Sequence, residues 1–298
     1  MSVMTRMPLA QLLEQVAVQF DTAELFYGHG TDNPWDEAVY LVFTALGIAF
    51  ESDDSIMQRP VTEQEIALIT PLIHRRIEER IPVAYLVKEA WFAGLPFTVD
   101  ERVLIPRSPL AELIGQGFAS LIKNPPTRIL DLCTGSGCIG IATALAFEQA
   151  SVDLADISLE ALSLAQENIE RHGLQSRARA VESDLFSALE GPYDLILSNP
   201  PYVSQTEIDE LPPEYQHEPT LGLFSEEEGL AIPLQILRTA SNYLSDDGVL
   251  IMEVGYSHEA LSARLPQIPF LWLEFEHGGE GIFMLTAKQL RAAQTQLS

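Results

Sequence analysis

The chain has 298 residues, 47% of them hydrophobic and 20% charged, as is typical of a globular protein with one large or two ordinary domains. Its 17 basic and 43 acidic side chains give a formal net charge of −26, which repels nucleic-acid phosphates and attracts a basic protein, or serves solubility alone. No apolar run is long enough to span a membrane and the N-terminus MSVMTRMPLAQLLEQ lacks a signal-peptide core, so we expect no membrane association and a cytoplasmic location.

The first part of the chain has the periodicity of helices, from about residue 8 to residue 79. Pro34 stands at a predicted helix start, and Thr62 with Glu65 fits a capping box. These patterns predict a small helical domain over residues 1–89. No catalytic cluster lies within it. Such a domain joined to a catalytic one either recognises a large substrate or only stabilises the fold.

A connecting segment over residues 90–109 follows. Two short strands, 90–97 and 98–104, are predicted around Gly94 and form a β-hairpin linker. Arg107 then lies just before a helix predicted over 111–121. It is either an ordinary surface charge or a group that approaches an anionic part of a ligand.

The second predicted domain, residues 110–298, contains a glycine-rich turn between a strand and a helix. The strand 129–132 leads into Gly135-Ser136-Gly137-Cys138-Ile139-Gly140, a G-x-G-x-x-G sequence that lets a ligand approach the backbone at a helix N-terminus. Cys133 and Cys138 lie in this turn without further cysteine or histidine residues nearby. We therefore expect neither a zinc site nor a disulfide, and predict that both are small side chains that pack in the fold. The next strand, 151–155, ends at Asp156, whose carboxylate can accept hydrogen bonds from ribose hydroxyls.

Strands continue to alternate with helices, which predicts a parallel sheet with right-handed crossovers. After the strand 178–181, Asp184 can accept a hydrogen bond from an adenine amine, with Leu185 and Phe186 beside the base, or it can simply form a turn. A further strand is predicted over 248–254. A hairpin of strands 272–275 and 281–285 closes the sheet.

The sequence DLILSNPPYV places polar and aromatic groups at the carboxyl end of a buried strand, where ligands of α/β proteins bind. Asn199 and the two prolines end the strand, and Tyr202 follows. This set suits a planar NH2 group that is held by acceptors and covered by a ring, although a plain strand-ending turn has the same pattern. The residues thus predict a nucleoside-binding α/β domain and leave open whether its ligand is a nicotinamide cofactor or S-adenosylmethionine.

In order along the chain, DLCTGSGCIG, Asp156, SDLF and NPPY resemble the class I S-adenosylmethionine-dependent methyltransferases that act on amide or amine nitrogen. The upstream segment RIPVAYLVKEAWFAGLPFTVDERVLIPRSPLAELI, after a helical domain, resembles the protein glutamine-N5 methyltransferases, and this likeness covers nearly the whole chain. Cys133 stands where many members have glycine. After Arg107 the sequence SPLAEL departs from the R-P-E-T-E type of the release-factor enzymes and resembles the PrmB-like branch, which modifies bacterial ribosomal large-subunit protein three.

This resemblance implies a Rossmann-like, mostly parallel seven-stranded sheet, with S-adenosylmethionine as methyl donor and S-adenosylhomocysteine as product. It implies these cofactor-binding residues: Asp131, Thr134, Gly135, Gly137, Asp156, Asp184, Leu185 and Asn199. It implies these substrate-binding residues: Asn199, Pro200, Pro201, Tyr202 and Arg107. Asn199, Pro200 and Tyr202 are the expected catalytic residues. We predict no metal site, because His172, His217, His258 and His277 are scattered without ligand spacing.

The predicted mechanism follows from the weak nucleophilicity of an amide nitrogen. The Asn199 side-chain oxygen and the Pro200 carbonyl are expected to accept the two amide hydrogens, with Tyr202 on the amide plane and no general base. The alternatives are the same reaction on peptide release factors, adenine-N6 methylation of nucleic acid, a nicotinamide dehydrogenase, which leaves NPPY unexplained, and a non-catalytic binding module. Residues 204–229 are long enough to form a loop that covers the substrate.

Overall fold

A computed structural model describes residues 7–276 and 278–297, and the chain divides into two compact units. The helical unit contains the chain up to Ala90 together with Val99–Glu101 and Pro212–His217. The sheet unit contains Trp91–Thr98, Arg102–Leu211 and the chain from Glu218 onward. Each unit is described by itself.

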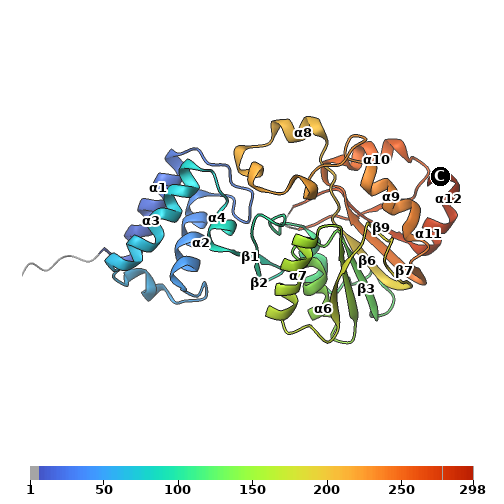
Figure 1. Ribbon diagram of the computed structural model, residues 1–298, viewed down its shortest axis with the longest axis horizontal. Helices are drawn as coiled ribbons and strands as arrows, with labels where there is room; N and C mark the ends of the chain where they lie inside the picture. The colour runs from blue at the N-terminus through green and yellow to red at the C-terminus, as the bar shows by residue number, and fades with distance from the viewer. Residues whose placement is uncertain (1–6, 277, 298) are drawn as a thin grey trace, which may run out of the picture. The chain divides into compact units, whose positions relative to one another are not determined.

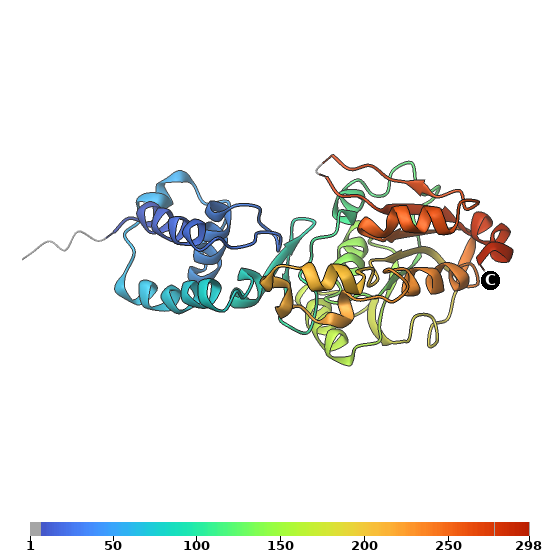
Figure 2. The same ribbon diagram turned by 90° about the horizontal axis from the view of Figure 1, so that it is seen from above.

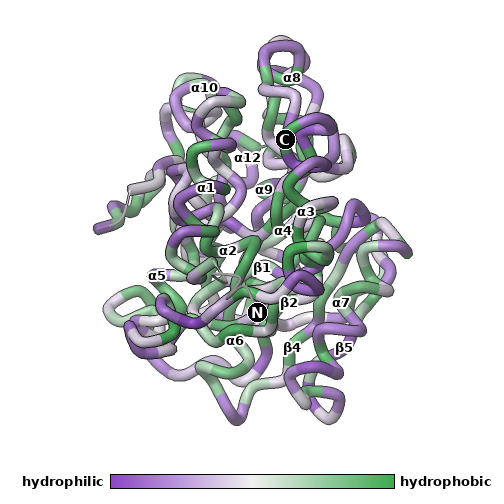
Figure 3. Tube along the Cα trace, turned by 90° about the vertical axis from the view of Figure 1, so that its left-hand side faces the viewer, coloured by the Kyte–Doolittle hydropathy of each residue, from purple (hydrophilic) through white to green (hydrophobic). Residues whose placement is uncertain are grey.

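The helical unit is built from short amphipathic helices that pack side by side (Figures 1 and 2). Its elements are α1 (Leu9–Thr22), α2 (Pro34–Leu46), the 3-10 helix η1 (Asp54–Gln58), α3 (Glu63–Glu78), α4 (Val83–Val87) and, from far along the chain, the 3-10 helix η2 (Pro213–His217). Apolar and hydrophilic residues alternate along α1 to α3 (Figure 3), and the apolar ones form the core.

Both predicted helix starts are confirmed. Pro34 occupies the first turn of α2, where its missing N–H costs nothing, and the Asn33 side chain accepts from the Asp36 N–H at 2.9 Å. Thr62 and Glu65 form the capping box of α3, with hydrogen bonds in both directions between side chain and backbone.

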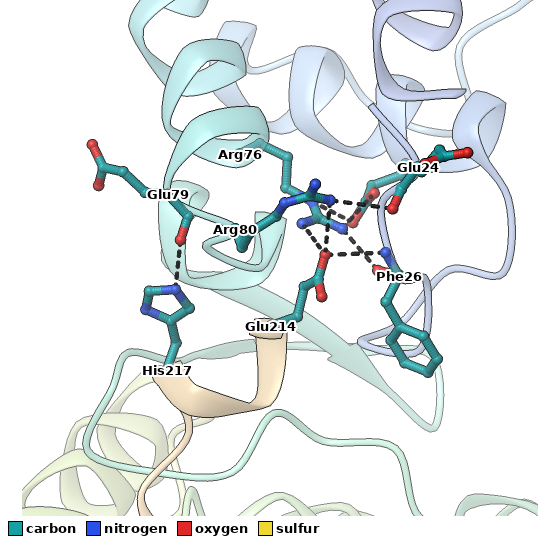
Figure 4. Close-up of polar contacts among 8 residues, drawn as sticks. Glu24, Phe26, Arg76, Glu79, Arg80, Glu214 and His217 are labelled. Carbon is teal, nitrogen blue, oxygen red and sulfur yellow. Dashed lines mark hydrogen bonds and ion pairs between the residues drawn. The ribbon is translucent and has the colours of Figure 1, made fainter. Parts of the chain in front are cut away.

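A buried network of charges lies inside the helical unit (Figure 4). The Arg76 guanidinium donates to the two Glu37 carboxylate oxygens at 3.3 and 3.2 Å, and to Glu214 at 3.2 Å. It also donates to the Phe26 carbonyl at 2.8 Å. Arg76 and Glu214 are each 1% exposed and Glu37 is 3% exposed, so these charges are compensated within the protein and not by water, with Arg80 as a second cation 3.8 Å from Glu214.

Glu214 belongs to a segment that follows the Asn-Pro-Pro-Tyr sequence and folds with the helical unit. Glu214 accepts from the Phe26 N–H at 3.0 Å, and the His217 ring nitrogen bonds to the Glu79 carbonyl at 2.8 Å (Figure 4). The Tyr215 ring lies 4.6 Å from the His29 ring. Such contacts join residues far apart in the chain, so no pattern in a short stretch of sequence predicts them.

The predicted boundaries at 89/90 and 109/110 therefore differ from the division of the structure. Residues 212–217 belong to the helical unit because of their ion pairs and ring contacts, and residues 91–98 belong to the sheet unit. A hairpin is present as β1 (Glu89–Phe92) and β2 (Leu95–Thr98), but at other positions than predicted: the range 90–97 contains most of both strands and their turn, and of 98–104 only Thr98 is in a strand. Ala93 and Gly94, with φ of 50° and 75°, make the two-residue turn between them.

The sheet unit is organised around a seven-stranded sheet of order β5-β4-β3-β6-β7-β9-β8. Its strands are β3 (Arg128–Leu132), β4 (Ser151–Asp156), β5 (Ala178–Glu182), β6 (Tyr193–Ser198), β7 (Leu244–Glu253), β8 (Leu271–Trp272) and β9 (Ile282–Thr286). The first five are parallel to one another. Strand β9 runs antiparallel to β7, and β8 runs antiparallel to β9. The predicted mostly parallel sheet is confirmed. The closing antiparallel pair is present, but β8 has two residues and shares only Trp272 with the predicted strand 272–275.

Helices cover both faces of this sheet (Figure 1). The helices of the sheet unit are α5 (Leu110–Gly115), α6 (Cys138–Ala146), α7 (Leu159–Arg171), α8 (Gln205–Glu210), α9 (Ala231–Ala240), α10 (His258–Arg264), α11 (Ala287–Ala292) and α12 (Gln294–Leu297), with the 3-10 helices η3 (Thr220–Gly222) and η4 (Gly255–Ser257). Alternate residues of each strand enter two cores: Ile129 packs with α5, α6 and α7, whereas its neighbour Leu130 packs with α9, α10 and α11.

The helix predicted over 111–121 is wrong in its second half, because α5 ends at Gly115. Gly117, Phe118 and Ser120 take left-handed φ values of 61°, 54° and 69°, which a helix cannot contain. Phe118 is fully buried, so the packing of its ring determines the backbone conformation of this segment and overrides the local preference for a helix.

Candidate active site

The candidate site lies where the order of the strands reverses. Strands β3 and β6 are neighbours at the middle of the sheet, with Leu132 paired to Ser198 at their carboxyl ends. The chain adds β4 and β5 on one side and β7 on the other. Such a switch point leaves a crevice at the carboxyl ends of the strands, which is the usual ligand site of this architecture. The glycine-rich turn and the Asn-Pro-Pro-Tyr sequence both begin here.

The glycine-rich turn has the backbone that its sequence predicts. Gly135 and Gly137 have φ of 54° and 81°, and Gly137 precedes the first turn of α6. The Thr134 N–H donates to the Ala155 carbonyl at 3.0 Å and so fixes the turn beside β4. Cys133 also has a positive φ, 61°, a backbone conformation that favours glycine.

Asp131, the last acidic residue of β3, is fully buried beneath this turn. One of its oxygens accepts from the Thr134 hydroxyl at 2.5 Å and from the Gly140 N–H at 2.8 Å. The other oxygen has no hydrogen-bond partner among the described residues. Burial raises the pKa of Asp131 to about 7, against the two hydrogen bonds. A buried carboxylate with one unsatisfied oxygen is suited to a ligand that brings a donor, above all a cationic one.

Gly140 allows α6 to approach β3 closely. A Cβ at this position would lie 2.5 Å from a Leu154 methyl carbon and 2.8 Å from the Asp131 Cβ. Only a glycine therefore brings its N–H within reach of the Asp131 carboxylate.

Asp156 at the end of β4 is held by the backbone on both sides. Its carboxylate accepts from the Gly135 N–H and the Ser158 N–H, each at 2.9 Å, and burial raises its pKa. A carboxylate has about four acceptor positions, so it can still bind hydroxyl groups of a ligand. Ile157 follows it, 53% exposed although apolar.

The loop after β5 brings Asp184 and Leu185 to the same edge of the sheet. The Ser183 N–H donates to the Asp156 carbonyl at 2.9 Å, and the Ser183 hydroxyl donates to the Leu185 carbonyl at 2.6 Å. Leu185 is buried with φ of 47°, and Asp184 is exposed.

The Asn-Pro-Pro-Tyr sequence follows β6 directly. The Ser198 hydroxyl donates to the Leu132 carbonyl at 2.8 Å and so joins the ends of β6 and β3. Asn199 comes next and is half-buried, and Pro200 is buried. The two prolines lie outside the strand, as expected of residues without an N–H.

Tyr202 is held by the last residue of β7 and by residues that follow it. Its hydroxyl donates to Glu253 at 2.8 Å, and its carbonyl accepts from the Ser257 hydroxyl at 2.9 Å. Gly255 lies against the ring, since a Cβ there would come within 2.6 Å of it. Sequence reasoning missed Glu253, although an acidic residue at the end of the apolar strand GVLIMEV is a signal that could have found it.

Arg107 has a partner within the sheet unit. It donates to the two Glu218 oxygens at 2.6 and 2.8 Å, and Glu218 also accepts from the Ile105 N–H at 3.0 Å. Glu218 is buried, so the pair joins the segment before α5 to the end of the loop after Tyr202. The structure therefore gives Arg107 a structural partner, and the predicted contact with a ligand stays a prediction.

The remaining predicted features have local roles. Cys133 and Cys138 are free thiols, and burial raises the pKa of Cys138 to about 12, as suits packing residues. His172 and His258 bond to the carbonyls of Pro96 and Gly255, and His277 lies outside the described residues. In residues 7–276 and 278–297 no cluster of three or more metal-binding side chains occurs, and no helix is long and apolar enough to cross a membrane.

Comparisons with known proteins agree with this geometry. Residues 114–211 match the family model of the methyltransferase small domain. The chain is 46% identical over 269 residues to the ribosomal protein uL3 glutamine methyltransferase of Francisella tularensis subsp. tularensis, across 89% of this chain and 86% of that protein. It is 42% identical over 285 residues to the protein of the same name from Bordetella pertussis, across 95% and 96%.

A solved structure of a methyltransferase from Pyrococcus furiosus is 17% identical, with a TM-score of 0.48, across 75% of this chain and 97% of that one. The two sequence relatives match most of the chain, so their likeness extends beyond the sheet unit into the helical unit.

Proposed function

The chain belongs to the family of the ribosomal protein uL3 glutamine methyltransferases, and we propose that it methylates the side-chain amide nitrogen of a glutamine in that ribosomal protein. Membership of the family confirms the predicted class I fold, the methyltransferase activity and the use of S-adenosylmethionine. The observation that carries the proposal is the pairing of Leu132 with Ser198, which brings the glycine-rich turn and Asn-Pro-Pro-Tyr to one crevice.

The residues around that crevice fit S-adenosylmethionine. The ligand carries an amino group and ribose hydroxyls, which are the donors that the free oxygen of Asp131 and the carboxylate of Asp156 require. The proposed cofactor-binding residues are Asp131, Thr134, Gly135, Gly137, Asp156, Asp184, Leu185 and Asn199. We add Ile157, whose exposed apolar side chain next to Asp156 can cover a base. When bound, S-adenosylmethionine supplies an electrophilic methyl group on a sulfonium centre.

The protein's own task is to hold the amide so that its nitrogen can react. The amide lone pair is delocalised into the carbonyl, and no ordinary side chain is basic enough to deprotonate the group. The Asn199 side-chain oxygen and the Pro200 carbonyl accept the two amide hydrogens, with Pro201 fixing the backbone and Tyr202 covering the amide plane. Catalysis then rests on positioning and on fixed dipoles. Arg107, paired with Glu218, is better suited to hold the loop than to bind the substrate.

The net charge of −26 supports a basic protein as substrate, because opposite charges speed encounter. The helical unit is the proposed recognition domain, and the cytoplasm, where ribosomal proteins are made, is the proposed location. The same charge disfavours nucleic acid as substrate.

The test offers labelled S-adenosylmethionine with ribosomal protein uL3, a peptide release factor and duplex DNA in separate reactions. We expect label on uL3 alone, lost when its acceptor glutamine is replaced. Label on the release factor would keep the chemistry and overturn the substrate, and label only on DNA would overturn both.

Asn199→Ala tests the mechanism. Because it removes one of the two acceptors for the amide hydrogens, turnover should fall by about 100-fold or more, whereas the Kd for S-adenosylmethionine, to which Asn199 is one of several proposed contacts, should rise far less. Asn242→Ala, at an exposed asparagine, is the control and should leave both unchanged. A variant at Asn199 that lost only cofactor affinity would refute the assigned role.

A further inference from the structure

Glu253 is a buried acidic side chain of the sheet unit to which the proposed mechanism gives no role. It is the last residue of β7 and is 6% exposed. A carboxylate in such a place is costly unless hydrogen bonds satisfy its oxygens. Glu253 has two hydroxyl donors, one on each oxygen, and one of them belongs to a proposed catalytic residue.

One donor is the phenol of Tyr202, at 2.8 Å from the first oxygen. The other is the Ser108 hydroxyl, at 2.5 Å from the second oxygen. The Ser108 oxygen in turn accepts from the Leu110 N–H at 3.2 Å, at the start of α5. A continuous line of hydrogen bonds thus runs from α5 through Glu253 to the ring of Tyr202.

The directions of these bonds matter. A carboxylate can only accept, so the ionised Glu253 forces both hydroxyls to donate to it. The bond to Glu253 thereby holds the phenol end of the Tyr202 ring in place. The Ser257 hydroxyl holds the backbone of the same tyrosine, and Gly255 leaves room for its ring. Tyr202 is therefore fixed at its carbonyl, its ring and its hydroxyl.

From this geometry we infer that Glu253 is a positioning residue for methyl transfer: it fixes the Tyr202 ring against the substrate amide and links that ring to Ser108. The inference rests on the proposed role of Tyr202. Burial raises the pKa of Glu253, against the hydrogen bonds from Ser108 and Tyr202 and the positive charge of Arg107. Activity should therefore require Glu253 in its ionised form and fall on the acid side of a carboxyl titration shifted upward from its ordinary range.

The test is a double-mutant cycle in the full-length enzyme with Glu253→Gln and Tyr202→Phe. Glu253→Gln keeps the size of the side chain but replaces one acceptor by an NH2 donor, which faces one of the two hydroxyls. We expect kcat to fall about 10- to 100-fold, because a small misplacement of a catalytic group costs that much, with an unchanged Kd for S-adenosylmethionine. The double variant should be no slower than the slower single variant, since both changes break the same hydrogen bond.

A merely structural Glu253 would behave differently. The two losses in kcat would then multiply, or cofactor affinity would fall as much as kcat, and either result would overturn the inference. Ser108→Ala removes only the second donor and should lower kcat less than Glu253→Gln while keeping the acid-side titration. The loss of activity at acid pH should be absent from Glu253→Gln. Its persistence in that variant would also contradict the positioning role of Glu253.

The cycle is run on whichever protein the wild-type enzyme methylates. An error in the proposed substrate would appear in the wild-type reaction, whereas an error about Glu253 would appear only in the variants.

Discussion

Replacing Arg76 by methionine tests how far the helical unit depends on its buried charges. The guanidinium satisfies Glu37 with two hydrogen bonds, Glu214 with one and the Phe26 carbonyl with one. Methionine fills much of the space but removes the ion pair of the buried Glu37 and leaves the buried Glu214 with the more distant charge of Arg80, at 3.8 Å. Breaking a buried ion pair costs about 3–5 kcal/mol in the free energy of unfolding. Glu37 limits the cost by taking up a proton, since burial already raises its pKa to about 7.

The control is Arg75→Met, one residue earlier on α3. The Arg75 side chain is 46% exposed and pairs with Glu79 at 3.3 Å, so its loss should cost about 0–1 kcal/mol. The two variants remove the same charge from the same helix and differ only in burial.

Native-state hydrogen exchange of the full chain, followed by mass spectrometry, separates the units. In Arg76→Met, amides of α2, α3 and η2 should exchange faster by roughly two to four powers of ten, because each 1.4 kcal/mol is tenfold. Amides of β3 and β6 serve as internal reference and should change little. Equal protection of α3 and η2 in the Arg76 and Arg75 variants would refute the claim that the network stabilises this unit.

Three further outcomes are expected. Asp131→Asn should be more stable than wild type at pH 8 without cofactor and should bind S-adenosylmethionine more weakly, as urea unfolding and calorimetry would show. Gly140→Ala should lose about 1–3 kcal/mol of unfolding free energy to overpacking, whereas Gly115→Ala, with open space around it, should be neutral or stabilising. Glu218→Gln should weaken the hold on Arg107 and make the loop after Tyr202 more sensitive to limited proteolysis; unchanged cleavage would contradict that role.

The sign of the Asp131 effect follows from its pKa, which rises from 3.8 to about 7 on folding. The folded state holds the proton more tightly, so this contribution to stability is fully present below pH 3.8 and is lost as pH rises through about 7. Asparagine cannot ionise and keeps its oxygen for Thr134 and Gly140. If the wild type and Asp131→Asn lost equal stability between pH 5 and pH 8, the pH dependence of stability would come from groups other than Asp131.

Local patterns predicted the parts of the fold that depend on neighbours in sequence. The capping box at Thr62 and the left-handed turn at Gly135 require only residues a few positions apart. The order of strands and helices then placed Asn199 beside the glycine-rich turn, because carboxyl ends of parallel strands share an edge. The helix predicted beyond Gly115 does not form, because burial of Phe118 overrides local preference.

Contacts over long sequence distances could not be predicted in this way. Glu253 reaches Ser108 and Tyr202 only once β7 has joined the sheet, and Glu218 meets Arg107 only when the loop has folded. Glu214 shows the limit most clearly. Nothing in the sequence PPEYQH around it indicates that it completes an ion network begun by Arg76.

The placement of η2 in the helical unit has a consequence for synthesis of the protein. A nascent chain usually folds its N-terminal domain while the rest is still being made. Here Arg76 emerges early with Glu37 alone, and its second carboxylate follows only when residue 214 has been added. The helical unit therefore completes its folding after most of the sheet unit's strands have left the ribosome, and translation of the first 90 residues alone would yield an unfinished domain.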